Sequence, residues 1–411
     1  MLSRPQPIGI FPFPAGLLLL PESASPLASR ATASLMAGAI PEEWPEEWRF
    51  FERALQDDRD GAMRRLAEAG DDAVSAYNRF VLAGGDASRA VTGGDGALRA
   101  LGEVAAYVQG ARDDLPAMGE ELEGEFAAIA ALARSAWHLE RAEVAQAAER
   151  LAAGVSAARQ VSPVLAAQLQ GQRAQLLAQE PARGDDAIAA WRDAVQLASV
   201  ARLPDLRADL LLGLALALHE RASTARHLLV EAINTYQEAL HAGITLEARP
   251  ETYALVQNNL GLAYVAMPMS AAGDKIRLAV GVQSFREALK VYTRDAFPEQ
   301  WSSAMLNMAN ALQYLPSSHP QENLIEAVNG YEALLEVRNK ALDPVGYARL
   351  LANQANALAH LGMFGPAVEK LTEARKLLSW HGEDDAASAL LEQMERINAQ
   401  LAATAGATGA S

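Results

Sequence analysis

Apolar residues recur at helical spacing through the second half of the chain. A small residue is followed four positions later by a large one, and three positions further by another small or medium one. These spacings place all three side chains on one face of an α-helix. The five copies are Ala187, Trp191 and Ala194; Ala232, Tyr236 and Ala239; Gly281, Phe285 and Ala288; Ala327, Tyr331 and Leu334; and Ala367, Leu371 and Ala374. We predict that each copy is the buried face of a helix, in which small residues let a neighbouring helix approach and the large residue fills the remaining space.

Four prolines mark the period of this pattern. Pro204, Pro250, Pro298 and Pro344 are separated by 46, 48 and 46 residues. A fixed period is typical of a stacked array rather than of one globular core. Proline suits the first position of a helix, because its φ angle is preset and its missing N–H is not needed there. The sequence therefore predicts successive helix pairs, each beginning at one of these prolines.

The predicted helix pairs resemble the tetratricopeptide repeat. The stretch LGLAY at 260–264 matches the Leu-Gly-x-x-Tyr of its first helix. Ala232, Tyr236 and Ala239 match the Ala-x3-Tyr-x2-Ala of its second helix. The resemblance implies an all-α fold, an α-solenoid of helix pairs wound as a right-handed superhelix, whose first helices line a concave groove.

The period departs from the family pattern, which repeats about every 34 residues. We expect the extra residues to lie in a longer loop between the two helices of a pair, which shortens only at 362–366 in the last pair. The sequence AFPEQW (Ala296–Trp301) is similar to a long-period bacterial subfamily. Such arrays are often fused to caspase-like protease or nucleotide-binding regulatory domains, and neither is visible in this sequence.

The chain divides into five segments by composition and pattern. They are a flexible Pro-rich N-terminus at 1–41, a helical cap region at 42–115, degenerate repeat-like helix pairs at 116–203, clear repeats at 204–380, and a capping helix with a disordered tail at 381–411. The Gly-rich stretch 83–96 is expected to be a loop. Trp44 and Trp48 are interpreted as core anchors of the cap, with an exposed patch for a partner as the alternative.

Residues 1–41 contain seven prolines and no helical periodicity, which favours a flexible segment. A secretory leader within residues 1–30 is the alternative. Arg4 and Ala24 fit its charged start and cleavage site, whereas Pro12 and Pro14 interrupt the apolar helix that it requires.

Charge and composition exclude several functions. The formal net charge of −16 argues against a nucleic-acid partner and against an anionic membrane surface. The absence of cysteine excludes disulfides, thiolate catalysis and cysteine-based zinc sites, and it fits a reducing, cytoplasmic location. The apolar run Leu210–Leu218 is far shorter than the roughly 20 residues of a membrane span, so we assign it to the core.

The candidate binding residues are asparagines on the predicted first helices. Asn259, Asn307 and Asn353 hold one equivalent position, Asn310 and Asn356 follow three residues later, and Asn258 adjoins the first. An amide both donates and accepts, so a row of amides can hold the backbone of an extended peptide. Some tetratricopeptide arrays resemble this arrangement and use an asparagine ladder in that way. The alternative is that each amide ties its own helix to a neighbour.

No motif for catalysis or for a cofactor is present. The seven histidines lack the spacing of a helical metal pair, and there is neither a Gly-x-Ser-x-Gly motif nor a Gly-Lys dipeptide. We therefore predict a non-catalytic scaffold or adaptor that binds a protein or an extended peptide, without metal or cofactor. Two rivals remain open: a regulatory sensor whose superhelix responds to a small ligand or signal peptide, and an enzyme with a site within 42–160, which a deep cleft with a shifted titratable group would favour.

Overall fold

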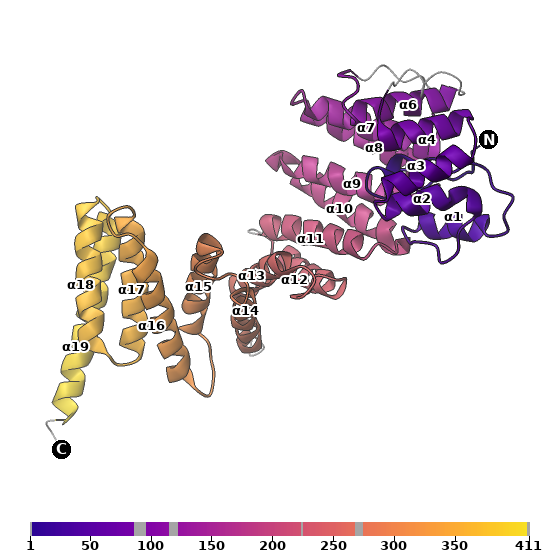
Figure 1. Cartoon of the computed structure of the whole chain (residues 1–411). Helices are drawn as coiled ribbons and strands as arrows, with labels where there is room; N and C mark the ends of the chain where they lie inside the picture. Colours follow the sequence, from indigo (N-terminus) through magenta and orange to yellow (C-terminus); the bar gives the residue numbers. More distant parts are fainter. Residues whose placement is uncertain (1, 86–95, 115–121, 223–224, 268–273, 409–411) are drawn as a thin grey trace. The chain divides into compact units, whose positions relative to one another are not determined.

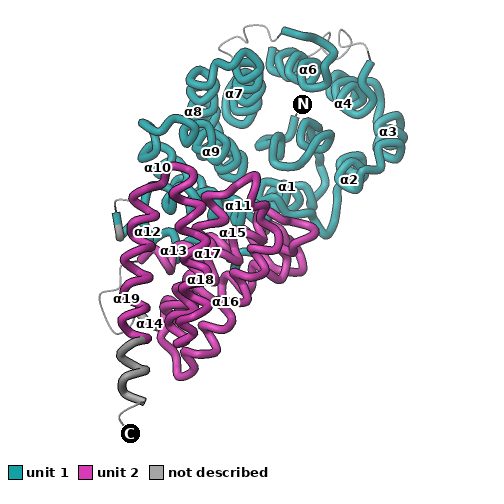
Figure 2. Tube along the Cα trace, turned by 90° about the vertical axis from the view of Figure 1, so that its left-hand side faces the viewer, with its two compact units in different colours: residues 1–243 teal, residues 244–411 magenta. Residues whose placement is uncertain are grey.

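The computed structural model describes residues 2–85, 96–114, 122–222, 225–267 and 274–408, and within them it is an all-α protein (Figure 1). The chain forms two compact units, residues 1–243 and 244–411 (Figure 2). No helix in these described ranges is both long enough and apolar enough to cross a bilayer. Most of the Gly-rich stretch 83–96 lies outside the described residues.

The first unit is built from eleven described α-helices and four short 3-10 turns. The turns are η1 (Ala15–Leu17), η2 (Glu46–Trp48), η3 (Pro181–Arg183) and η4 (Ala198–Val200). The helices are α1 (Ala28–Met36), α2 (Arg49–Leu55), α3 (Arg59–Glu68), α4 (Ala73–Ala83), α6 (Gly96–Val108), α7 (Gly124–Leu139), α8 (Val144–Ala158), α9 (Pro163–Ala178), α10 (Gly184–Leu197), α11 (Pro204–Arg221) and α12 (Arg226–His241). From α7 onward, neighbours in sequence pack as antiparallel pairs, α7 with α8, α9 with α10 and α11 with α12.

The described residues of the second unit form seven helices of the same design. They are α13 (Pro250–Ala266), α14 (Asp274–Ala288), α15 (Pro298–Leu312), α16 (Pro320–Val337), α17 (Pro344–His360), α18 (Phe364–Trp380) and α19 (Asp384–Thr408). Within this unit, helices that follow one another in sequence pack mainly against each other, as in a solenoid. The four periodic prolines all stand at the first position of a helix, as predicted.

The small–large–small pattern makes the core, as predicted, in four of its five copies, whereas Trp191 of the first copy is only partly buried. Tyr236, Phe285, Tyr331 and Leu371 are fully buried, and so are the alanines four residues before and three after the tyrosine of α12. Glycine at the facing position makes room for the large ring. A Cβ added to Gly213 would lie 2.5 Å from the Trp191 indole. The packing between helices therefore defines tetratricopeptide-like pairs, an α-solenoid architecture.

The extra length of the repeat is distributed differently from the prediction. Connections within pairs run 222–225, 267–273, 313–319 and 361–363, whereas those between pairs run 242–249, 289–297 and 338–343. The long connections between pairs are ordered turns. The Thr245 carbonyl accepts from Arg249 N and its hydroxyl from Ala248 N, and Thr293 repeats both bonds with Phe297 and Ala296. The expectation that the loop inside each pair alone lengthens the period is wrong.

The N-terminal segment is not flexible, contrary to the prediction. Ile8, Leu18, Leu19 and Leu20 are fully buried and belong to the same hydrophobic core as α2 to α9. Figure 2 shows the beginning of the chain inside the curve made by the helices of the first unit. The segment is rich in proline and has no helical periodicity, but burial of its compact apolar run orders it.

The other segment boundaries predicted from the sequence also differ from those of the structure. The cap at 42–115 and the pairs at 116–203 share one core with the N-terminal segment and are not separate bodies, and the division between units falls at 243/244 rather than at 203/204. Helix α19 reaches Thr408, so most of the expected tail is helical. Trp44 and Trp48 are 4% and 0% exposed, which confirms them as core anchors.

Candidate functional site

The predicted amides lie on the first helices of the second unit. Asn258 and Asn259 are on α13, Asn307 and Asn310 on α15, and Asn353 and Asn356 on α17. All six are partly buried. This intermediate exposure results from their place next to the buried pairs of these helices, which are Leu-Gly in α13, Met-Ala in α15 and Gln-Ala in α17. The structure divides them into two groups.

Three of the amides tie helices together. Asn353 Nδ2 donates to Asn310 Oδ1 at 3.2 Å, which joins α17 to α15. Asn356 Nδ2 donates to Gln313 Oε1 at 2.8 Å, and its own Oδ1 accepts from Gln393 Nε2 of α19 at 3.3 Å. These bonds link successive first helices, so for this group the structural alternative holds in the isolated chain.

The side chain of Asn310 is also held in place by a hydrogen bond from Tyr331 of α16. The Tyr331 hydroxyl donates to Asn310 Oδ1 at 2.6 Å and accepts from Gln313 Nε2. Burial raises the pKa of the Tyr331 phenol, so it remains a protonated donor at neutral pH. The large core residue of α16 thus orients an amide on the neighbouring helix α15.

The other amides retain their hydrogen-bonding capacity. Among the described residues, neither Asn259 nor Asn307 has a partner for its side-chain amide. The Asn258 Oδ1 atom is buried and, within the same residues, unpaired. An unpaired buried acceptor costs about 1–3 kcal/mol. A ligand that donates a hydrogen bond at this end of the row would recover that free energy.

An apolar cavity adjoins the row. It has a volume of about 280 Å³ and lies between the end of α13, the start of α14 and the end of α15. Its lining residues are Tyr264, Val265, Met267, Arg277, Leu278, Asn310, Ala311 and Tyr314. Tyr314 is 59% exposed, and burial raises the pKa of Tyr264, which lies deeper. Mostly apolar walls with a few convergent polar groups are typical of a binding pocket.

Sequence reasoning missed this cavity and its lining. In the sequence, Tyr264 stands out only as part of the family motif. Arg277 lies in the first turn of α14, and Tyr314 lies just after the end of α15. Arg277 Nη1 approaches the Met267 sulfur at 3.4 Å, a contact that no spacing rule anticipates. An aromatic residue just beyond the end of a first helix, Tyr314, is the feature of the sequence that could have indicated the cavity.

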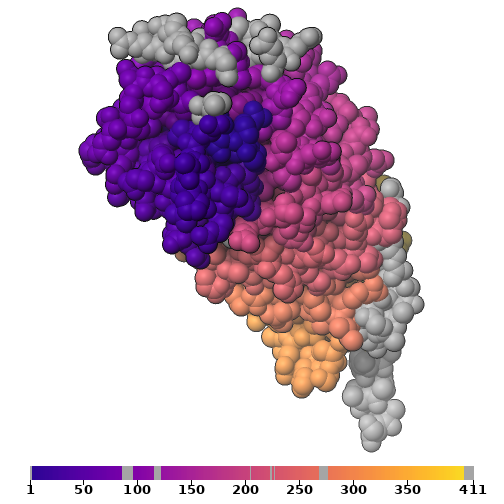
Figure 3. Space-filling view, turned by 90° about the vertical axis from the view of Figure 1, so that its right-hand side faces the viewer, coloured from indigo at the N-terminus to yellow at the C-terminus, as the bar shows by residue number. Residues whose placement is uncertain are grey.

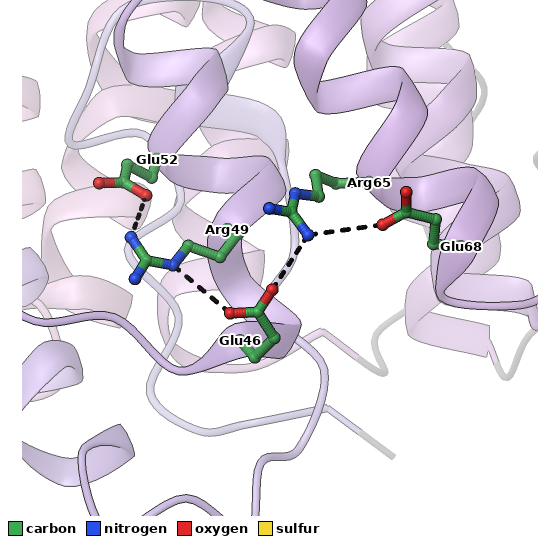
Figure 4. A network of polar contacts seen from close by, with 5 residues as sticks. All are labelled: Glu46, Arg49, Glu52, Arg65 and Glu68. Atoms are coloured by element: carbon green, nitrogen blue, oxygen red, sulfur yellow. Dashed lines mark hydrogen bonds and ion pairs between the residues drawn. The ribbon is translucent and has the colours of Figure 1, made fainter.

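A pocket of about 340 Å³ in the first unit has several acidic residues in its wall. Most of its lining belongs to residues 42–160, the region of the alternative enzyme site. Figure 4 shows its ion pairs: Glu46 bonds Arg65 at 3.0 Å and lies 3.7 Å from Arg49, while Arg65 also reaches Glu68 and Arg49 reaches Glu52. Because the carboxylates already share two guanidinium groups, the pocket is less acidic than its composition indicates. Groups of three or more potential metal ligands are absent from the part of the chain that the structure describes.

Asp72 lines this pocket and has a lowered pKa. Desolvation acts to raise it, but hydrogen bonds from Ser75 and from the Val74 backbone N–H outweigh that effect. Asp72 is the N-cap of α4, so its shift is the one expected of a capping carboxylate rather than of a general acid or base.

Comparison with known proteins gives structural likeness only. No protein-family model matches the chain, and no curated protein matches it. A structure described as the TPR2AB-domain:pHSP90-complex of yeast Sti1 is similar, with 17% identity and a TM-score of 0.26, over 66% of this chain and 98% of that chain. The crystal structure of Rap protein complexed with competence and sporulation factor is similar over 90% of this chain and 98% of that chain, with 11% identity and a TM-score of 0.35.

These likenesses are too distant to define a site. The description of the chain as tetratricopeptide-like therefore rests on its own helix pairs, on the buried small–large–small faces and on the glycines opposite the large rings. Those features define the class of protein: a helical-repeat solenoid.

Proposed function

We propose that this protein is a non-catalytic scaffold or adaptor that binds an extended peptide segment of a protein partner along the amide row of its second unit. The observations that support the proposal are the unpaired amides of Asn259 and Asn307 on successive first helices, and an apolar cavity that is lined by Asn310 of the same row. Asn259 and Asn307 can hold a peptide backbone, while the cavity beside Asn310 and Tyr314 can accept an apolar side chain. A cytoplasmic location is part of the proposal and is supported by the absence of cysteine.

The proposal is tested with peptides selected from a random display library on the full-length chain. Affinity is then measured by fluorescence anisotropy for the wild type and for the Asn259→Ala/Asn307→Ala double variant. Each lost hydrogen bond contributes about 0.5–1.5 kcal/mol, so we expect binding to weaken about tenfold. Tyr314→Ala removes one wall of the cavity and should weaken peptides that bear a large apolar residue.

Asn398→Ala serves as the matched control, since Asn398 is an exposed asparagine of α19 away from the row. Its affinity should equal that of the wild type. Selected peptides that bind equally well to the double variant and to the wild type would place the binding surface elsewhere. Library selection that yields no binder to the full chain would contradict peptide binding as such.

A further inference from the structure

The segment Leu2–Pro21, here called the inner segment, is folded as a closed loop within the first unit. Its two ends meet, with Ser3 N donating to the Leu20 carbonyl at 3.1 Å, and its middle closes by a bond from Gly9 N to the Gly16 carbonyl at 2.7 Å. Gln6 adds a cross-brace, since its amide accepts from Leu20 N and donates to the Leu20 carbonyl, both at 2.9 Å. The loop is therefore a compact body with its own internal bonds.

Helix side chains hold the inner segment by its backbone. Asn78 of α4 brackets one residue: its Nδ2 donates to the Leu19 carbonyl and its Oδ1 accepts from Leu19 N, both at 2.8 Å. Other helix side chains bond further backbone groups: the Tyr77 hydroxyl donates to the Leu17 carbonyl, Gln168 Nε2 to the Ile10 carbonyl and Trp48 Nε1 to the Pro21 carbonyl. Side chains that both donate and accept thus bond the backbone of the inner segment, as they can bond the backbone of a bound peptide.

The receiving helices carry a buried charge that only the inner segment neutralises among the described residues. Glu125 of α7 is fully buried. Its Oε1 accepts from Gln6 N at 2.9 Å and lies 2.9 Å from Arg4 Nε, while the Arg4 guanidinium also lies over the Phe126 ring at 4.4 Å. A buried carboxylate without its partner is strongly unfavourable, so this position demands a cation and a free backbone N–H from its occupant.

The space around Gly9 restricts which residue can occupy this position of the inner segment. Gly9 has a φ of +79°, and a Cβ there would lie 2.4 Å from Ile129 Cδ1 of α7 and 2.7 Å from Leu165 Cδ1 of α9. Only glycine fits both the backbone conformation and the space. In Figure 3 the indigo residues of the beginning of the chain are seen on one face of this unit, beside the purple and magenta residues that follow them in the sequence.

The residues that connect the inner segment to α1 are more exposed than the inner segment itself. Glu22, Ala24 and Pro26 are exposed and lead from Pro21 to α1. The inner segment is thus mostly buried, internally bonded and attached through an exposed linker, and the short 3-10 turn η1 is its one helical element.

We propose that the interior of the first unit is a peptide-binding site whose resident ligand is the inner segment, and that the site accepts the same sequence as a separate peptide. The ligand it takes is an arginine-bearing, leucine-rich loop with glycine at its tight turn. This site is independent of the amide row of the second unit, because every residue in it belongs to residues 2–168.

The test uses the full chain with a specific protease site replacing residues 23–25. The folded protein is cleaved there and mixed with a fluorescent synthetic peptide of residues 2–21. We expect saturable one-to-one uptake of the labelled peptide by the cleaved protein, with release of the resident fragment seen by native mass spectrometry. The uncleaved protein should take up at least tenfold less, because a tethered segment competes at millimolar effective concentration.

Matched variants define the chemistry of the site. A Gly9→Val peptide should not bind, and an Arg4→Ala peptide should bind at least tenfold more weakly, whereas a peptide extended by residues 22–23 should bind as the parent does. Cleaved protein that keeps its fragment and never admits an excess of labelled peptide would overturn the proposal. Cleaved protein that loses the fragment together with its helical circular dichroism, and does not regain it on adding peptide, would overturn it too.

Hydrogen exchange on the uncleaved protein gives a second measurement. If the inner segment is a ligand, the amides of Ser3, Gly9 and Leu19 should exchange through an opening that leaves the amides of α7 and α8 protected. Exchange of all of these amides in a single cooperative unit would show that the inner segment is an inseparable part of the core and would contradict the proposal.

Discussion

Gly261 of α13 lies directly against the ring of Phe285 of α14, so that a Cβ on the glycine would stand 2.6 Å from Cε1 of the ring. The two residues belong to the two helices of one pair, and both are buried. The Leu-Gly of the repeat motif is thus a space requirement, because the large residue of the second helix occupies the volume that a side chain at 261 would need.

Gly261→Ala should therefore destabilise the second unit, although alanine is the better helix former. Overpacking of this kind costs about 1–3 kcal/mol. Gly184→Ala in α10 is the control, since a Cβ there would meet only the Arg221 side chain, at 3.9 Å, and it should leave stability unchanged or raise it by up to about 1 kcal/mol. Urea unfolding measures both, and equal midpoints for the two variants would refute the close-contact explanation.

Asn310 and Tyr331 should be energetically coupled. Asn310→Ala leaves the buried Tyr331 hydroxyl without its acceptor, at a cost of about 1–3 kcal/mol, whereas Tyr331→Phe removes the donor as well. In a double-mutant cycle we expect a coupling energy of about 0.5–2 kcal/mol from urea denaturation. Strictly additive effects would mean that the bond does not contribute.

Asn78→Ala should destabilise the first unit strongly. The substitution leaves both the N–H and the carbonyl of Leu19 buried without the partner that brackets them, which costs about 2–4 kcal/mol. Asn398→Ala, at an exposed site of α19, should change stability by no more than about 0.5 kcal/mol. Thermal unfolding followed by circular dichroism distinguishes the two, and a small effect at Asn78 would argue against the bracketing bonds.

His219 should make the first unit sensitive to mild acid. Burial lowers the pKa of its imidazole, whose Nδ1 lies 3.4 Å from the Tyr236 hydroxyl. The neutral ring is favoured in the folded state, so its contribution to stability is complete above the unfolded pKa of about 6.5 and is lost as the pH falls toward the lower folded value. The fall in melting temperature between pH 7 and pH 5 should be smaller in His219→Gln than in the wild type. His227→Gln, at an exposed histidine of α12, should leave the pH profile unchanged, and an unchanged profile in His219→Gln would refute the assignment.

The ion-pair network at Arg65 should contribute little. Its side chain is 43% exposed, and those of Glu46 and Glu68 are 72% and 69% exposed. Arg65→Ala is therefore expected to lower the stability of the first unit by less than about 1 kcal/mol, and the difference should shrink further in 1 M salt. A larger loss that persists at high salt would indicate that Arg65 acts through packing against the pocket wall instead.

Much of the candidate site followed from the repeat pattern. The period placed Asn259, Asn307 and Asn353 at one position on successive first helices, and the structure places them so. It could not indicate which amides bond each other, because the Asn353–Asn310 bond joins residues 43 positions apart through the stacking of two helices. Nor could it locate the cavity, which depends on how the ends of three helices meet.

The sequence by itself determined the helices and their buried faces, since a period of 3.6 residues and a proline at the first turn act locally along the chain. Only the tertiary structure decided the fate of residues 2–21. Their partners lie 59 residues away at Asn78 and 158 residues away at Gln168. An apolar run interrupted by prolines has no period of its own, so its order comes from its own closing hydrogen bonds and from the helices around it, and neither can be read from a local pattern.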